Sequence, residues 1–201
     1  MKYASIDIET TGLDFDSCEV IEIGAVVDTD LKTPIEKLPT YRFRIVKDVY
    51  CGEPYALAMH RDLFRAIAAN KPMVAHPISY LNLEDLYGRA YQFVETFELF
   101  LRRNGLDPRN FVAAGKNFAN FDANFLRRLQ GVGEKVRWHY RTLDPGNMFV
   151  LPSDQYVPGT PECCERAGVN VSDFEGNWHT SIFDAQVVVA LVKKGLERNE
   201  A

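Results

Sequence analysis

The stretch YASIDIETTGLDFDSCEVIEIGAVV, residues 3–27, decides how this chain folds. Residues 2–8 and 20–28 are dense in β-branched side chains and are separated by turn-forming residues that include Gly12, so they predict two strands. Residues 40–46, TYRFRIV, alternate in polarity and predict a third strand. The three strands together indicate an antiparallel meander at the start of the fold.

Helical patterns follow the predicted meander. Residues 55–69 and 84–103 have apolar side chains at helical spacing, and one side of the second segment collects Leu86, Ala90, Phe93, Phe97, Phe100 and Leu101. Further along, the sequence predicts a strand at 110–115, a helix at 121–130, a strand near 140–144 and a helix from about 183 to 197. Three early strands followed by alternating strands and helices predict an α/β fold with a mixed central sheet flanked by helices.

Size and composition bound the class of protein. With 201 residues and 46% hydrophobic residues, the chain is long enough for one domain, residues 1–201, with a substantial core. A net charge of −5 and a pI near 5.4 argue against a protein that coats long duplex stretches, so we expect any nucleic-acid contact to be local and short.

Cysteine spacing and hydropathy indicate the compartment. The four cysteines show neither C-x-x-C spacing nor a nearby histidine pattern, so we expect reduced thiols rather than a zinc site or disulfides. The sequence contains no signal-peptide pattern and no apolar run of membrane-spanning length. We therefore expect a cytoplasmic protein with no membrane partner.

Asp7 and Glu9 are the first candidate site residues. Because strand side chains alternate between faces, these two carboxylates point the same way, opposite to Ile6 and Ile8. Two like charges on one surface repel each other, and without compensation one of them takes up a proton. A divalent cation such as Mg²⁺ or Mn²⁺ removes the conflict, because carboxylate oxygens are its preferred ligands. The alternative is a solvated end of the sheet, where the two acids hydrate separately.

Two further carboxylates stand where amphipathic helical patterns begin. Asp122 opens the first of these patterns and Asp184 the second, and His179 lies five residues before Asp184 in the approaching loop. Each acid taken alone also fits a capping role at a helix N-terminus. Together with Asp7 and Glu9, the two acids favour a shared site.

Three blocks of the sequence match one protein family. They are D-x-E-T-T-G-L at 7–13, Asp122 followed by x-x-F-L, and H-x-x-x-x-D-A at 179–185. In these blocks, and in their order and separation, the chain resembles the DEDDh group of 3′–5′ exonucleases, which have a ribonuclease H-like fold. This group includes polymerase proofreading subunits, ribonuclease T and oligoribonuclease, and the resemblance spans nearly the whole chain.

The resemblance implies an activity and a role for each motif residue. It implies hydrolysis of phosphodiester bonds at the 3′ ends of single-stranded DNA or RNA, with release of nucleoside 5′-monophosphates. Asp7, Glu9, Asp122 and Asp184 would hold two divalent cations, Mg²⁺ or Mn²⁺, with Asp7 bridging them, and His179 would be the general base. Two cations about 3.5–4 Å apart can activate the attacking water and stabilise the leaving 3′ oxygen.

The resemblance also implies contacts with the terminal nucleotide. The predicted substrate-binding residues are Thr10, Gly12, Leu13, Met59, His60 and Asn117. From the residues alone, Gly12 also fits a plain turn glycine and Leu13 a core residue. Asn117 stands five residues before Asp122, as in oligoribonuclease-like members, whereas many proofreading-like members have His-Asn there. Because Phe118 follows Asn117 here, the subfamily stays open, and Phe118 fits the core better than a stacking role.

A non-catalytic nucleic-acid or partner-binding module with the same fold is the alternative function. The intact set of four acids and His179 argues against it, because degenerate members should lose at least one of them.

The choice among DNA, RNA and very short oligomers depends on a 2′-hydroxyl contact and on pocket depth, so it stays open. Only a few residues follow the last predicted helix, so we expect a free-standing nuclease, and related homodimeric enzymes leave a homodimer open.

Overall fold

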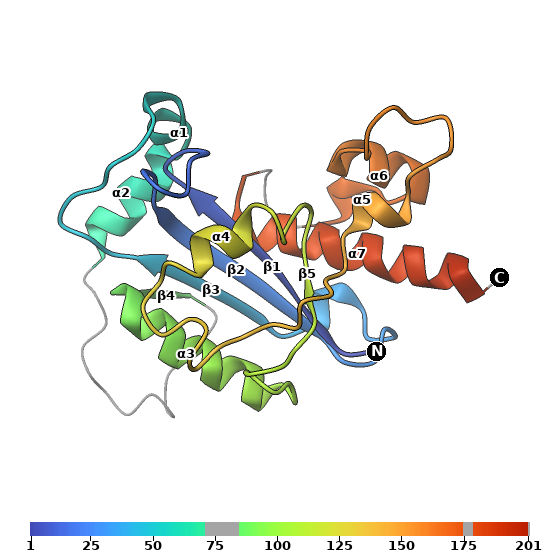
Figure 1. The fold of residues 1–201 in the computed structure, drawn as a ribbon, viewed down its shortest axis with the longest axis horizontal. Helices are drawn as coiled ribbons and strands as arrows, with labels where there is room; N and C mark the ends of the chain where they lie inside the picture. Colours follow the sequence, from blue (N-terminus) through green and yellow to red (C-terminus); the bar gives the residue numbers. More distant parts are fainter. Residues whose placement is uncertain (71–84, 175–178, 201) are drawn as a thin grey trace.

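In the computed structural model, residues 1–70, 85–174 and 179–200 are described. Within these ranges a five-stranded mixed sheet lies at the centre, in the order β4-β3-β2-β1-β5 (Figure 1). The strands are β1 (Tyr3–Thr10), β2 (Val20–Asp28), β3 (Thr40–Ile45), β4 (Leu86–Gly88) and β5 (Ala113–Ala114). β1, β2 and β3 are antiparallel, whereas β4 joins β3 and β5 joins β1 in parallel. The predicted meander and mixed sheet are confirmed.

Helices cover both faces of this sheet (Figure 1). They are α1 (Pro54–Met59), α2 (Arg61–Ala69), α3 (Ala90–Arg103), α4 (Asp122–Leu126), α5 (Pro145–Met148), α6 (Thr160–Ala167) and α7 (Ser181–Glu200), with 3₁₀ turns η1 (Ile35–Lys37) and η3 (Val171–Asp173). α7 packs across β1 and β2, and α5 and α6 pack against α7. α3 packs against β3.

Side-chain alternation along β1 divides the core between two layers. Ile6 and Ile8 lie in a buried cluster with the phenylalanines of α3, whereas Tyr3 lies in a cluster with the valines of α7. Asp7 and Glu9 have the same parity as Tyr3, so they belong to the face that α7 covers. The sequence-based prediction that the two acids share the face opposite Ile6 and Ile8 is confirmed.

The segment 55–69 was expected as one helix, and this prediction is wrong. The chain forms α1 and α2, separated at His60, whose backbone leaves the helical conformation. The His60 side chain is buried, and its Nε2 lies 3.4 Å from Oε2 of Glu9. The break between α1 and α2 places the His60 side chain in the core, beside Glu9.

The helix expected at 84–103 begins later than predicted, at Ala90, and residue 84 lies outside the described residues. Leu86–Gly88 form β4 instead, because they pair with the free edge of β3. The backbone of Arg89 is extended, and its N–H donates to the Gln92 side chain, which caps the start of α3. Backbone pairing with a sheet edge has overridden the helical spacing of Leu86.

The middle of the chain is less regular than expected. The helix predicted at 121–130 ends at Leu126, and the strand predicted near 140–144 is limited to a bridge between Ala114 and Leu143. The strand predicted at 110–115 shortens to Ala113–Ala114. The final helix, predicted from about 183 to 197, is α7. Helices α5 and α6 were not predicted, since both are too short for a clear apolar period.

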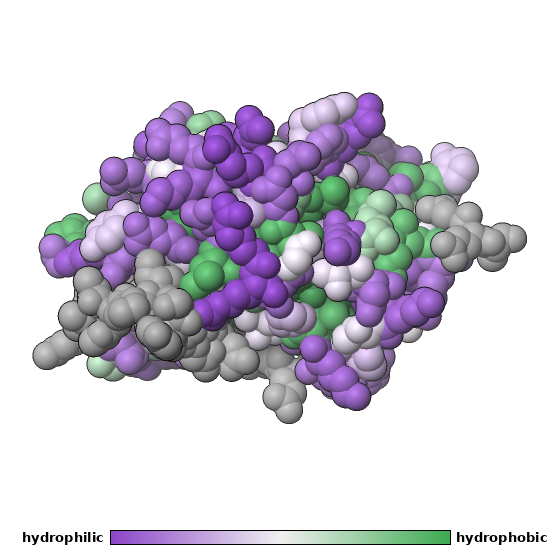
Figure 2. All heavy atoms as spheres, turned by 90° about the horizontal axis from the view of Figure 1, so that it is seen from below, coloured by the Kyte–Doolittle hydropathy of each residue, from purple (hydrophilic) through white to green (hydrophobic). Residues whose placement is uncertain are grey.

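All four cysteines are free thiols in the structure, as expected, and only Cys51 is exposed. On the face shown in Figure 2, hydrophilic residues predominate and hydrophobic ones emerge in patches between them. No helix in the described ranges combines the length and the hydropathy that crossing a membrane requires.

Candidate metal centre and active site

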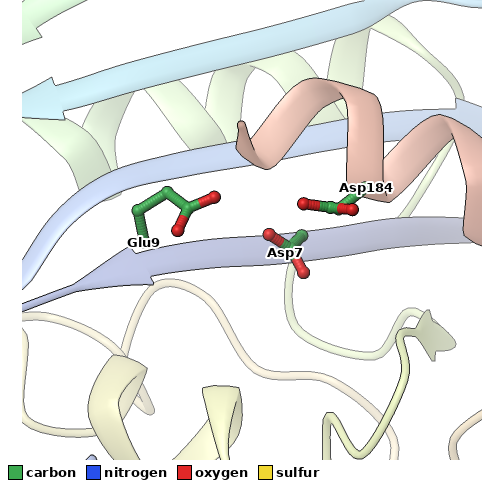
Figure 3. A group of neighbouring side chains, drawn as sticks. All are labelled: Asp7, Glu9 and Asp184. Carbon is green, nitrogen blue, oxygen red and sulfur yellow. The ribbon is translucent and has the colours of Figure 1, made fainter. Parts of the chain in front are cut away.

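Three carboxylates from the two ends of the chain meet between β1 and the start of α7 (Figure 3). Asp7 and Glu9 project from β1, and Asp184 projects from the first turn of α7. One ligand oxygen of each residue lies within 4.8 Å of the corresponding oxygens of the other two. The structure thus brings together three of the four acids that the sequence singled out, and we call them the acid cluster.

The close approach of α7 to the sheet depends on Gly24. Gly24 is the β2 residue paired with Asp7. A Cβ atom at this position would lie 2.4 Å from the carbonyl carbon of Ser181, the first residue of α7. A side chain on Gly24 would therefore push α7, and Asp184 with it, away from β1.

Asp122 lies beside the acid cluster but not within it. It opens α4 and is 4% exposed. Burial raises the pKa of Asp122 to about 7, and hydrogen bonds from the backbone amides of Asp122 itself and of Ile8 partly oppose this shift. Ile8 lies between Asp7 and Glu9, so its hydrogen bond to Asp122 places Asp122 at the edge of β1. This part of the edge is open because β5 does not pair with it. Its charge still acts on Asp7 and Glu9, whose pKa values it raises.

The electrostatics of the acid cluster call for a compensating charge. Burial, followed by the charge of Asp122 and then of Glu9, raises the pKa of Asp7 well above its usual range. Burial, followed by the charge of Asp184, raises the pKa of Glu9 to about 9. Burial also raises the pKa of Asp184 to about 6. Hard carboxylate oxygens at this spacing suit Mg²⁺ or Mn²⁺, so the residues fit the implied cations.

His179 stands at the mouth of the site. It is exposed, and its backbone has a positive φ of 65°, a left-handed conformation that is uncommon for residues other than glycine. Its backbone N–H donates to Oδ2 of Asp184 at 3.0 Å, and this hydrogen bond connects the loop to the acid cluster. Buried His60 instead approaches Glu9 from inside the protein, and burial lowers the pKa of its imidazole.

Two cavities adjoin the acid cluster. The first, of about 340 Å³, is lined by Asp7, Ile8, Glu9, Thr10, Gly12, Leu13, Glu53, Tyr55, Ala56, Met59, His60, Phe121, His179 and Asp184. The second, of about 450 Å³, is lined by Asp7, Lys116, Thr160, Pro161, His179, Asp184 and Val188. Because Asp7, His179 and Asp184 line both cavities, an elongated ligand that occupied both cavities would pass the acid cluster.

The turn after β1 forms part of the first cavity and is held firmly. Thr10 Oγ1 donates to the Gly12 carbonyl at 2.7 Å, and the Leu13 N–H donates to Glu53 Oε1 at 3.1 Å. A Cβ on Gly12 would lie 2.5 Å from Cys18 Sγ, so only glycine fits there without displacement. Leu13 is 75% exposed, so the alternative interpretation of Leu13 as a core residue is wrong.

The structure separates Asn117 from the other predicted substrate-binding residues. The first cavity is lined by Thr10, Gly12, Leu13, Met59 and His60. Asn117 is not among the described residues that line either cavity. The Asn117 N–H donates to Asp144 at 2.9 Å. Phe118, for which a core role was favoured, is 1% exposed and packs edge-on against Trp138.

Two residues at the cavity walls, Tyr55 and Lys116, were not predicted from the sequence. Tyr55 is 81% exposed at the first cavity, and Lys116 brings a positive charge to the second. Lys116 directly follows the glycine after β5, at the end of the strand beside β1, so its place in the chain was a usable signal. Tyr55 follows Pro54 in the first turn of α1, where a helix pattern alone does not reveal which face stays open.

The fold, a mixed sheet that begins with three antiparallel strands and is flanked by helices, is that of solved ribonuclease H-like 3′–5′ exonucleases. No protein-family model matches the sequence, and no curated protein matches it by sequence. Solved structures nevertheless match the fold over almost the whole chain.

Three of these structures illustrate the likeness. Exonuclease I from Methylocaldum szegediense matches 99% of this chain at a TM-score of 0.63 and 14% identity. S. pombe Pop2p in its Mg²⁺ and Mn²⁺ bound form matches 98% at a TM-score of 0.60 and 13% identity. E. coli exonuclease I in complex with a dA16 oligonucleotide matches 96% at a TM-score of 0.58 and 12% identity. This chain spans 41% and 40% of the two exonuclease I chains and 83% of Pop2p.

Proposed function

We propose that residues 1–201 form one exonuclease domain that removes nucleoside 5′-monophosphates from the 3′ ends of single-stranded nucleic acids with the help of divalent cations. The observation that carries this proposal is the acid cluster, with carboxylate oxygens within 4.8 Å of one another at the junction of two cavities. The Mg²⁺ and Mn²⁺ of Pop2p and the oligonucleotide of E. coli exonuclease I support the choice of cation and substrate.

The acids divide into direct and supporting ligands. Asp7, Glu9 and Asp184 would hold the cations directly, and Asp122 would assist from the edge of β1. Divalent cations bound there supply Lewis-acid activation of a water molecule and stabilisation of the leaving 3′ oxygen. The protein itself contributes a closely spaced, preformed set of oxygens, with Glu9 buried and Asp7 and Asp184 partly buried, whose mutual repulsion the cations would relieve.

His179 takes the proton from the attacking water in this proposal. Its ring lies at the wall of both cavities and is exposed, so it can pass the proton on to solvent. The hydrogen bond from its N–H to Asp184 holds the loop in register with the acid cluster. General-base catalysis of this kind contributes about 10²–10⁴-fold to the rate.

The two cavities suit the two sides of the scissile phosphate. We assign the terminal nucleotide to the first cavity, where Leu13 and Tyr55 expose apolar surface against which a base can pack. We assign a backbone phosphate to Lys116 in the second cavity. Its Nζ lies 4.0 Å from Asp144 Oδ1, and both oxygens of Asp144 already accept backbone N–H groups, of Asn117 and Gly146. The Lys116 ammonium is therefore only loosely paired.

Digestion of 5′-labelled single-stranded DNA and RNA oligonucleotides with Mn²⁺ or Mg²⁺ tests the proposal. We expect a ladder that shortens from the 3′ end, no product with chelator, and no product from Asp7→Asn. Asp62→Asn changes an acid on α2 whose side chain is 76% exposed, so this control should remain active. A circular single strand should resist the enzyme because it has no 3′ end.

Two results would contradict the proposal. Unshortened oligonucleotides under every metal would exclude an exonuclease. If such a protein still bound oligonucleotides, and Asp7→Asn bound them equally well, the chain would be a non-catalytic nucleic-acid-binding module instead.

A further inference from the structure

A fifth acid lies next to the acid cluster and is not explained by the proposed chemistry. Glu22 on β2 is paired with Glu9 across the sheet and is 2% exposed. Unlike the acid cluster, it has strong partners on both oxygens. Arg44 Nε donates to its Oε2 at 2.7 Å, and Ser181 donates to its Oε1 through Oγ at 2.7 Å and N at 3.2 Å. Because Arg44 neutralises its charge and both of its oxygens are engaged, Glu22 does not need a metal cation.

On the sheet side, Glu22 is held by a row of paired residues. Glu9 pairs with Glu22, Glu22 with Arg44, and Arg44 with Tyr87, so the row crosses four strands. Arg44 is 8% exposed, and its Nη1 donates to Asp85 at 2.6 Å and to the Tyr87 hydroxyl. Because a guanidinium forms several hydrogen bonds in one plane, this arrangement fixes the direction in which the Glu22 carboxylate points.

On the helix side, Glu22 holds the N-terminal end of α7. Ser181 is fully buried, two residues after His179 and three before Asp184. Its N–H is among the first amides of the helix, which have no partner within the helix, and the Glu22 carboxylate accepts it. Gly24, two residues along the same strand, leaves the space that this contact requires.

We propose that Glu22 is a positioning residue whose contact with Ser181 sets the distance between β1 and α7, and thereby the spacing of Asp184 from Asp7 and Glu9. The inference rests on the metal site of the proposed function, and it gives Glu22 no contact with metal or substrate. The carboxylate joins a strand that carries one side of the acid cluster to a helix that carries the other side.

Hydrogen exchange at the Ser181 amide tests the contact without metal. In Glu22→Ala this amide loses its acceptor, so we expect its exchange to be at least about ten-fold faster than in the wild-type protein. Glu22→Gln retains a side-chain oxygen for Ser181 and should protect the amide better than Glu22→Ala does. Unchanged protection in Glu22→Ala would overturn the proposal.

Calorimetric titration with Mn²⁺ tests the consequence for the metal site. We expect Glu22→Ala to weaken Mn²⁺ binding by about 10–100-fold, the range seen when residues that orient metal ligands are removed. Ser181→Ala, which keeps the backbone contact and all metal ligands, should weaken binding less. The double variant should bind Mn²⁺ about as weakly as Glu22→Ala, because both substitutions act on the same contact between Glu22 and Ser181.

Asp28→Asn is the matched control. Asp28 lies on the same face of β2, is fully buried and pairs with Lys193 of α7 at 3.3 Å, but at the far end of the strand. It should lower thermal stability and leave Mn²⁺ affinity unchanged. Wild-type Mn²⁺ affinity in Glu22→Ala, or additive losses in the double variant, would overturn the positioning role. A wild-type chain that binds no Mn²⁺ while Ser181 stays protected would instead refute the proposed function.

Discussion

Replacing Asp184 by Asn should stabilise the metal-free protein at neutral to alkaline pH while abolishing its activity. Burial raises the pKa of Asp184 from 3.8 to about 6, although the His179 amide stabilises the charged form. A carboxyl whose pKa is higher in the folded state binds its proton more tightly there. Its contribution to stability is therefore fully present below about pH 4 and is lost as the pH rises through about 6.

The size of this effect follows from the pKa difference. At about 1.4 kcal/mol per pKa unit, the rise from 3.8 to about 6 corresponds to roughly 3 kcal/mol of lost stability above pH 7. Asparagine has nearly the same shape, carries no charge and keeps an oxygen for the His179 N–H. For a chain of 201 residues, where each kcal/mol shifts Tm by about 2–4 °C, we expect an increase of up to roughly 6–12 °C.

Thermal unfolding in chelator at about pH 3 and about pH 8 measures this difference, because one value lies below the unfolded-state pKa of Asp184 and the other above its folded-state pKa. The Asn variant should exceed the wild-type Tm only at the higher pH, and Asp62→Asn should match the wild type at both. Added Mn²⁺ should raise the wild-type Tm at the higher pH and leave the variant nearly unchanged. An Asn variant that is less stable than the wild type in chelator at the higher pH would refute the reasoning.

Three further predictions address the chemistry and the substrate. His179→Ala should lower kcat by about 10²–10⁴-fold while calorimetry gives wild-type Mn²⁺ affinity, and a lost Mn²⁺ site would contradict its role as base. Lys116→Ala should weaken oligonucleotide binding and reduce the slope of log affinity against log salt by about 0.7, measured by fluorescence anisotropy, and an unchanged slope would exclude a phosphate contact. Tyr55→Ala should weaken binding by about 1–3 kcal/mol in the same assay, whereas wild-type affinity would show that no base stacks there.

Local patterns in the sequence were sufficient to predict the strands that carry the site. Strand alternation alone places Asp7 and Glu9 on one face, and the structure covers that face with α7. The helix that opens near Asp184 was also visible as a run of apolar residues behind an acid. These features depend on neighbours within a few residues, so a single sequence contains them.

Features that depend on distant partners could not be predicted in this way. Leu86 keeps helical spacing with the phenylalanines of α3, yet the open edge of β3 draws it into a strand. Glu22 was visible as one more acid in a predicted strand, but its partner Ser181 lies 159 residues away. The sequence contains both residues and gives no sign that they meet.

The central claim is that the acid cluster exists to hold divalent cations. Anomalous diffraction from a crystal grown with Mn²⁺ tests it most directly. We predict two Mn²⁺ ions about 3.5–4 Å apart, one of them coordinated by Asp7, Glu9 and Asp184. Strong Mn²⁺ peaks elsewhere and none among these three carboxylates would contradict the claim.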